Sequence, residues 1–262
     1  MNCGTTSLHH YLNLHPEISM TNEKELDFFI KEINYKLGVE WYKSHFVNMN
    51  TNIRGESSPS YTKYPKFKGV PQRIYRLLPD IKLIYIVRNP IERIITHYNH
   101  NLSKGREYRS LDEALSEFQN NSYILYSKYY TQLKIYFRYF EKDKILILDS
   151  EDLYKNRLDT LKKIFQFLEV DETYKHTEFN KILHQSRDKK IDNKFSEYFS
   201  KVPVIENTKK ILPDSLYRLI FQKNIIIKDL NNRIKMKILN YLERDIDCLR
   251  KISGLELSNW DL

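Results

Sequence analysis

The sequence is poor in the residues that interrupt regular structure and in the residue that cross-links it. Six glycines, eight prolines and two cysteines occur among its 262 residues. So few glycines and prolines argue against a fibrous or disordered chain and favour long regular elements. The two cysteines, Cys3 and Cys248, stand near opposite ends without metal-ligand spacing. This usage argues against a disulfide framework and predicts a reducing, cytoplasmic location.

Long hydrophobic runs are missing too. The strongest, Ile225–Ile227, is followed at once by Lys228 and Asp229, so the sequence predicts neither a membrane span nor a secretion signal. Acidic residues are outnumbered, 34 against 43 basic ones, which gives a formal net charge of +9. That charge suits an anionic ligand such as a nucleotide, a nucleic acid or an acidic glycan, although most of these lysines serve solubility.

Apolar residues, by contrast, are abundant and regularly spaced. They make up 41% of the chain, enough for one core, and we predict a single domain spanning residues 1–262. Helical spacing predicts a long aromatic helix over Tyr123–Phe140 and another over Ile234–Ile252. Short apolar runs at residues 82–87 and 144–148 predict buried strands, and residues 18–20 and 53–56 are weaker candidates. The pattern indicates an α/β fold, a parallel sheet flanked by helices.

In such sheets ligands bind outside the carboxyl ends of the strands. The polar residues that follow the predicted strands are Lys24 with Glu25, Ser57–Tyr61, Arg88–Pro90 and Asp149–Asp152. We therefore expect the chemistry of the protein at this edge.

A first candidate for anion binding is the loop at the start of the chain. Gly4, Thr5, Thr6 and Ser7 run straight into a helical stripe, so their N–H groups and hydroxyls would surround an anion at the positive end of that helix. The alternative is that these hydroxyls are simple helix caps.

A second candidate is Arg88, which ends the most hydrophobic predicted strand. Asn89 suits a helix cap and Pro90 the first helical position. With Thr96 two helical turns on, the guanidinium can form a site for a second phosphate. The alternative is a structural salt bridge to a nearby carboxylate.

Glu25 is the candidate general base. It follows a predicted strand and precedes Phe28 and Phe29, so we expect its carboxylate to be partly desolvated and its affinity for a proton to rise. The alternative is a solvated glutamate in a run of charges. His9 and His10 have no partner at ligand spacing, so we predict no metal.

Taken in order, these motifs resemble those of sulfotransferases that use 3′-phosphoadenosine 5′-phosphosulfate, especially the bacterial and heparan-sulfate-type branch. Residues 3–8 resemble the family's 5′-phosphosulfate loop, residues 88–98 its 3′-phosphate motif, residues 24–29 the segment with the catalytic glutamate, and residues 55–61 a segment lining the site. Residues 145–153 and 254–260 are similar to its last core strand and its C-terminal signature.

The resemblance implies a P-loop-like nucleotide-binding fold and a sulfuryl transfer that needs no metal. It implies that Gly4, Thr5, Thr6 and Ser7 hold the 5′-phosphosulfate, that Arg88 and Thr96 hold the 3′-phosphate, that Glu25 is the catalytic base, and that Lys190 closes over the co-substrate. The acceptor would present a hydroxyl or an amine. A carbohydrate suits the polar stretches at residues 32–52 and 101–122, the expected walls of its pocket.

The sequence departs from the family pattern at its start. Asn2 stands where the family has a lysine, and such a loss typically costs about 10²–10³ in rate. The buried strand that the family places before the loop is absent, so we expect an N-terminally truncated copy with two neighbouring strand edges exposed. Two other readings remain: a catalytically weak or inactive nucleotide- or glycan-binding relic of the fold, and a nucleic-acid-binding protein with steeply salt-dependent affinity. The oligomeric state is left open.

Overall fold

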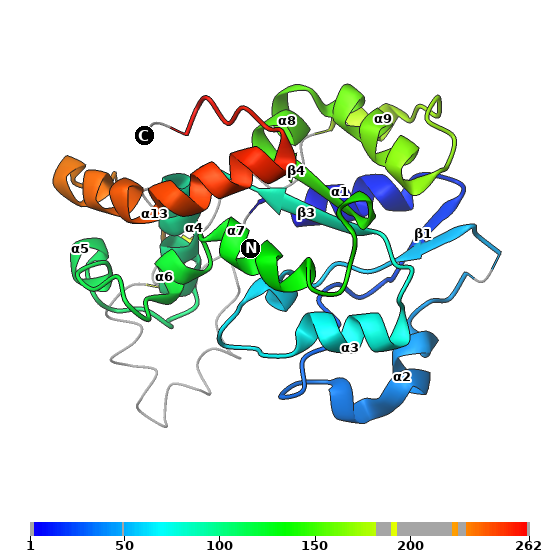
Figure 1. The fold of residues 1–262 in the computed structure, drawn as a ribbon, viewed down its shortest axis with the longest axis horizontal. Coiled ribbons are helices and arrows are strands. Elements are labelled where there is room, and N and C mark those ends of the chain that lie inside the picture. The colour runs from blue at the N-terminus through cyan, green and yellow to red at the C-terminus, as the bar shows by residue number, and fades with distance from the viewer. Residues whose placement is uncertain (1–2, 49, 182–189, 193–221, 225–228, 261–262) are drawn as a thin grey trace.

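The computed structural model describes residues 3–48, 50–181, 190–192, 222–224 and 229–260. Figure 1 shows its helices on both sides of a central layer of strands. The helices of eight or more residues are α1 (Thr5–Asn13), α3 (Val70–Leu77), α4 (Pro90–Ser103), α7 (Tyr129–Tyr136), α9 (Arg157–Leu168) and α13 (Asn232–Ser253). Shorter helices are α2 (Gly38–Ser44), α5 (Leu111–Ala114), α6 (Ser122–Leu125) and α8 (Ser150–Lys155).

The strands form parallel pairs, as the sequence predicts. Strand β1 (Ile18–Met20) pairs with β2 (Ile53–Gly55), and β3 (Leu83–Val87) pairs with β4 (Ile145–Asp149) in the register Leu83 to Ile145. A separate antiparallel pair joins β5 (Lys190–Asp192) and β6 (Gln222–Asn224). All four predicted strands are confirmed, with ends that differ by one residue at most.

The β3–β4 pair is covered on both faces. Ile86 and Leu148 pack in a cluster with apolar residues of α1 and α9. Val87 and Ile147 point into a second cluster, which α3, α4, α7 and α13 complete. Neighbouring residues of a strand point to opposite faces, so the continuous apolar runs found in the sequence are those of strands buried on both sides.

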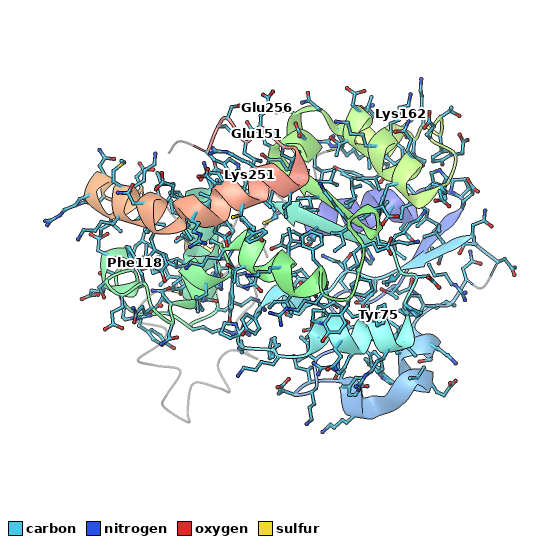
Figure 2. The ribbon with its side chains drawn as sticks, viewed as in Figure 1. Tyr75, Phe118, Glu151, Lys162, Lys251 and Glu256 are labelled. Atoms are coloured by element: carbon cyan, nitrogen blue, oxygen red, sulfur yellow. The ribbon has the colours of Figure 1, made fainter. Side chains whose placement is uncertain are left out.

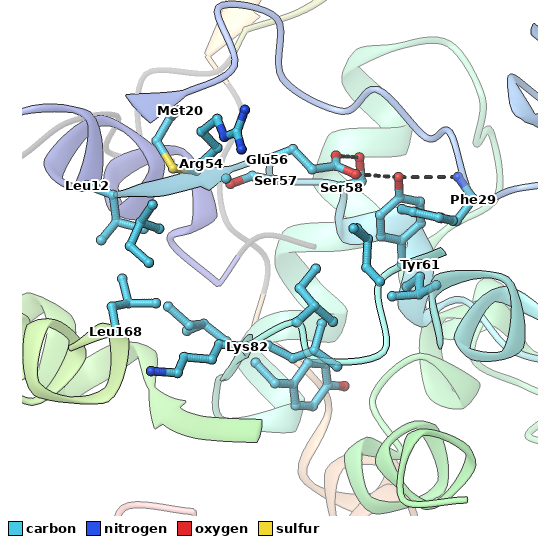
Figure 3. Close-up of a pocket in the computed structure, with 18 of the residues that line it drawn as sticks. Leu12, Met20, Phe29, Arg54, Glu56, Ser57, Ser58, Tyr61, Lys82 and Leu168 are labelled. Carbon is cyan, nitrogen blue, oxygen red and sulfur yellow. Dashed lines mark hydrogen bonds between the residues drawn. The ribbon is translucent and has the colours of Figure 1, made fainter. Parts of the chain in front are cut away.

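A cavity of about 1190 Å³ separates the two parallel pairs. Residues of β2 line one side and residues of β3 the other, with Leu12 of α1 and Leu168 of α9 among the apolar side chains between them (Figure 3). Within the described residues, β2 pairs only with β1 and β3 only with β4. Two strand edges therefore face the cavity.

The long aromatic helix predicted over Tyr123–Phe140 is wrong, because the segment divides into α6 and α7. The buried side chain of Arg93 donates from Nη1 to the Tyr123 carbonyl at 2.8 Å. In a continuous helix the Tyr123 carbonyl would accept a hydrogen bond from the Ser127 N–H. That N–H donates to the Ile124 carbonyl instead. A buried cation from another helix thus ends α6 where periodicity alone predicts continuation.

Helix α13 confirms the prediction for Ile234–Ile252 and leads to the final described segment. That segment ends at Trp260, which is 1% exposed and packs its ring 5.7 Å from that of Tyr129. Charged side chains such as Lys162 and Lys251 lie on the outside of the molecule (Figure 2). None of the described helices combines the length and the apolar character needed to cross a membrane.

Candidate functional site

The first loop forms the start of helix α1, whose N-cap residue is Gly4. Gly4 has a φ of 88°, in the left-handed region that glycine enters without a Cβ penalty, and α1 begins at the next residue. Because the N-cap residue is glycine, none of the three hydroxyls of Thr5, Thr6 and Ser7 occupies the N-cap position. Gly4 and Thr6 are exposed. The first turn thus presents the positive end of the helix dipole to solvent, where an anion can reach it.

This loop lies against the end of the β3–β4 pair. Cys3 is 3% exposed and belongs to the same apolar cluster as Ile86 and Leu148. A Cβ at Gly4 would lie 3.5 Å from the side chain of Leu153 in α8. The core therefore fixes the loop at the carboxyl edge, where ligands bind in parallel sheets.

Lys24 lies at the same helix start. Its Nζ donates to Thr6 Oγ1 at 2.6 Å, although the two residues are 18 positions apart in the chain. Burial lowers the pKa of Lys24, and the neighbouring Glu25 charge acts in the opposite direction. Sequence reasoning placed Lys24 at a strand end but gave it no role, because the contact depends on how β1 approaches α1.

His9 ties α1 to the ends of β1 and β2. Its Nε2 donates to the Thr21 carbonyl at 3.0 Å, and its Nδ1 lies 3.0 Å from Ser57 Oγ. Burial lowers the pKa of His9, and the charge of Lys24 lowers it further. A neutral ring that donates from Nε2 and accepts from the Ser57 hydroxyl satisfies both contacts, so His9 holds the site together.

Glu25 lies beside this helix start in an unusual backbone conformation. Both Glu25 and Asp27 have left-handed backbone conformations, with φ values of 60° and 48°. Such conformations cost energy in residues other than glycine, and they cluster at functional sites. The Glu25 N–H donates to the Ser57 carbonyl at 2.9 Å. The expectation that Glu25 is partly desolvated is wrong, because the residue is exposed: Leu26, Phe28 and Phe29 fill the core while Glu25 turns outward.

The partly buried carboxylate of the site is Glu56 instead. Tyr61 and Ser58 each donate a hydroxyl to it at 2.6 Å, drawn in Figure 3. Ser58 Oγ in turn accepts from the Asp27 N–H at 3.0 Å, so Glu56 anchors the strained loop that carries Glu25. Burial raises the pKa of Glu56, and its hydroxyl partners act against that rise. The sequence signal that could have identified Glu56 as a site residue is its position directly after β2.

A second charged group lies beside this network. Lys63 donates to Ser60 Oγ at 2.9 Å. Burial lowers the pKa of Lys63 and raises that of Asp27, and each charge partly offsets the effect of burial on the other. The charge of Glu25 acts on both groups, so Glu25, Asp27 and Lys63 form one electrostatic cluster next to the loop.

Arg88 directly follows β3 and contacts both Thr96 and Glu92. Its Nη1 donates to Thr96 Oγ1 at 3.4 Å, while its Nε and Nη2 each lie 2.9 Å from a carboxylate oxygen of Glu92. The Tyr129 hydroxyl donates to the Arg88 carbonyl at 2.8 Å. The predicted pair of Arg88 and Thr96 is thus brought together, and the structural salt bridge offered as its alternative is present as well.

The helix that carries Thr96 is capped as predicted, with an addition. The Asn89 side chain accepts from the N–H groups of Ile91 and Glu92 at 3.0 and 3.3 Å. Its amide also donates to the Asn259 carbonyl at 3.1 Å, so the end of the chain holds the start of α4. Sequence periodicity gives no signal for this contact between residues 170 positions apart.

Two predictions, the role of Lys190 and the absence of a bound metal, stay predictions. Lys190 begins β5, but its side chain is not among those described, so its role over the co-substrate stays a prediction. In the described part of the chain, no group of three or more histidine, cysteine, aspartate and glutamate side chains is arranged to hold a metal ion.

Comparison with known proteins gives this arrangement a family. The model of the sulfotransferase domain matches residues 2–211, which includes the first loop, Glu25, Arg88, Thr96 and Lys190. The chain belongs to the sulfotransferase family. Sulfotransferases of this family use 3′-phosphoadenosine 5′-phosphosulfate as co-substrate.

Several sulfotransferase relatives carry names that mention heparan sulfate. Over 179 residues the chain is 30% identical to mouse heparan sulfate glucosamine 3-O-sulfotransferase 5, which covers 64% of this chain and 50% of that protein. Over 188 residues it is 29% identical to human bifunctional heparan sulfate N-deacetylase/N-sulfotransferase 2, covering 64% of this chain and 21% of that protein. The chain thus matches half or less of the length of these curated relatives.

A solved sulfotransferase supports the fold. The crystal structure of a sulfotransferase from Alicyclobacillus acidocaldarius superposes with a TM-score of 0.70 at 20% identity, covering 98% of this chain and 94% of that one. The predicted α/β architecture with a parallel, helix-flanked sheet is therefore that of a known sulfotransferase fold.

Proposed function

We propose that this sulfotransferase moves a sulfuryl group from 3′-phosphoadenosine 5′-phosphosulfate to a hydroxyl or amine of a carbohydrate acceptor. The observation that carries the proposal is the pair of anion-binding groups at the carboxyl edge. One is the start of α1 after Gly4, with Lys24 on Thr6, and the other is Arg88 with Thr96 at the end of β3. A nucleotide with phosphates at both ends of its ribose has the charges that such a pair recognises.

The residues of the first loop suit the 5′-phosphosulfate. N–H groups in the first turn of α1 and the hydroxyls of Thr5, Thr6 and Ser7 are donors around one exposed point. Arg88 and Thr96 supply a guanidinium and a hydroxyl for the 3′-phosphate, and Glu92 would give up the guanidinium when the phosphate arrives. When bound, the co-substrate would supply an activated sulfuryl group, and these contacts would fix it for in-line attack.

Glu25 is the proposed base. The acceptor hydroxyl gives its proton to the Glu25 carboxylate as its oxygen forms a bond to sulfur, while the bond from sulfur to the phosphate oxygen breaks. The products are a sulfated acceptor and adenosine 3′,5′-bisphosphate. The left-handed, hydrogen-bonded backbone at Glu25 and Asp27 supports this role, because it fixes the main chain from which the exposed carboxylate extends.

Support for a carbohydrate acceptor comes from these relatives, whose names mention heparan sulfate and glucosamine. The basic side chain of Lys63, beside Glu25 and Asp27, would suit an acidic glycan. Residues 32–52 and 101–122 remain the expected walls of the acceptor site, and the cytoplasmic location stays a prediction.

The direct test incubates the purified chain with labelled co-substrate and a panel of glycans and phenols. We expect label in at least one glycan and a large fall in turnover for Glu25→Gln, about 10²-fold or more, because a positioned base contributes that much. Glu23→Gln is the matched control, since Glu23 is an exposed glutamate of the same segment. Equal rates for both variants would remove Glu25 as the base. Bisphosphate binding without transfer to any acceptor would favour the inactive relic.

A further inference from the structure

The first loop lacks a basic side chain of its own. Residues 1–7 contain neither lysine nor arginine. A phosphosulfate group carries negative charge, and more charge develops on its phosphate as the bond to sulfur breaks. A loop that holds it therefore needs a cation from elsewhere in the chain.

The structure places Lys24 there. Its ammonium lies 2.6 Å from Thr6 Oγ1, in the first turn of α1. A lysine at this end of a helix is in the less favourable position, because the helix dipole is also positive there. In the described residues no carboxylate lies within 4 Å of the Lys24 ammonium to balance it. The Lys24 ammonium and the N–H groups of the first turn are all hydrogen-bond donors, and an anion between them would accept hydrogen bonds from both.

Two further features favour a ligand-binding role over a purely structural one. Lys24 is half-buried, while Thr6 beside it is exposed, so an anion can reach the ammonium from solvent. Lys24 also directly precedes Glu25, in a loop whose N–H groups at Glu25 and Asp27 donate to Ser57 and Ser58. The ammonium and the proposed base are thus fixed on consecutive residues of one rigid turn.

We propose that Lys24 is the cation of the first loop: it binds the 5′-phosphate of the co-substrate and stabilises the charge that this phosphate gains as the sulfuryl group leaves. The inference rests on the proposed function and adds to it a residue from outside the loop. Glu25 would take the acceptor's proton on one side of the sulfuryl group, and Lys24 would face the departing phosphate on the other.

The test separates the two phosphates by calorimetry with adenosine 3′,5′-bisphosphate and with adenosine 3′-phosphate. Lys24→Met should weaken binding of the bisphosphate about tenfold or more, while leaving binding of the 3′-phosphate unchanged. Lys24→Arg should restore most of the affinity, because it keeps the charge. Lys31→Met, a change at an exposed lysine of the neighbouring segment, should bind both nucleotides as the parent does.

A kinetic measurement provides the second readout. With an acceptor found for the parent, Lys24→Met should lower kcat by about 10²–10³-fold, and Lys24→Arg should recover part of that loss. If the parent binds the bisphosphate and Lys24→Met binds it equally well, the role of Lys24 is overturned while the proposed function stands. If the parent does not bind it at all, the proposed function fails and this inference with it. A melting temperature equal to the parent's shows that each variant is folded.

Discussion

At the scale of the single residue, Arg88 combines the contact with Thr96 on which the proposed phosphate site rests with a structural ion pair. Its guanidinium contacts Thr96 and also pairs with Glu92, whose side chain is 59% exposed. An exposed pair of this kind is worth about 0.2–1 kcal/mol. A phosphate that accepts two hydrogen bonds from a guanidinium gains more than that, so we expect a bound 3′-phosphate to displace Glu92 from Arg88.

This competition makes Glu92→Gln informative. Removing the carboxylate removes the ion pair between Glu92 and Arg88, so we expect adenosine 3′,5′-bisphosphate to bind up to about fivefold more tightly. Arg88→Ala should abolish that binding, whereas Arg106→Ala, at an exposed arginine near the other end of α4, should not change it. If Glu92→Gln weakens binding, the carboxylate helps the ligand and does not compete with it.

Glu56 makes a prediction about pH. Because burial raises the pKa of its carboxyl above the ordinary value of 4.5, the folded chain holds that proton more tightly than the unfolded chain. The stability that this proton contributes is full below pH 4.5 and is lost as the pH rises through the raised pKa. The free energy of unfolding should fall over that range by up to about 1.4 kcal/mol per pH unit from this group.

Urea unfolding at a series of pH values tests the point. Glu56→Gln stays neutral at every pH, so its unfolding free energy should fall less steeply than that of the parent, while Glu23→Gln should keep the parent's slope. Identical slopes for all three proteins would mean that Glu56 titrates normally in the folded chain.

At the scale of the element, α4 depends on Asn89 at its start. Asn89→Ala loses the cap and should lower the free energy of unfolding by about 1 kcal/mol. Asn89→Asp keeps an acceptor for Ile91 and Glu92 but loses the donor to the Asn259 carbonyl, so it isolates the contact with the C-terminal segment. Thermal or urea unfolding of the three proteins measures both effects. Equal stability of Asn89→Ala and the parent would show that the cap contributes nothing.

The elements also show how far the sequence carries a prediction. Strands β3 and β4 were predicted because their apolar runs are uninterrupted, and the cap of α4 because Asn-Pro follows a strand directly. The break between α6 and α7 was missed, since a buried arginine of another helix causes it. In the site, the pairing of Arg88 with Thr96 follows from helical spacing. The contacts of Lys24 with Thr6 and of Glu56 with Ser58 depend on loop conformation, which no local pattern encodes.

At the scale of the whole molecule, the first loop and the segment that contains Asn259 both lie at the candidate site. The first loop packs on the end of β3, and Asn259, near the other end, holds the start of α4. The cavity between β2 and β3 separates the strand pair that leads to Lys24 and Glu25 from the pair that leads to Arg88. Helix α1 links the two strand pairs. Its His9 forms a hydrogen bond to the Thr21 carbonyl directly after β1, while its Leu8 packs with residues of the β3–β4 pair.

A crystal structure with adenosine 3′,5′-bisphosphate tests whether this edge binds one nucleotide by both of its phosphates. We predict the 5′-phosphate at the first turn of α1 within hydrogen-bond distance of Lys24. We predict the 3′-phosphate on Arg88 and Thr96, with Glu92 turned away. A nucleotide bound elsewhere, for example in the cavity between β2 and β3, or an Arg88–Glu92 pair that stays closed beside a bound nucleotide, would contradict the account.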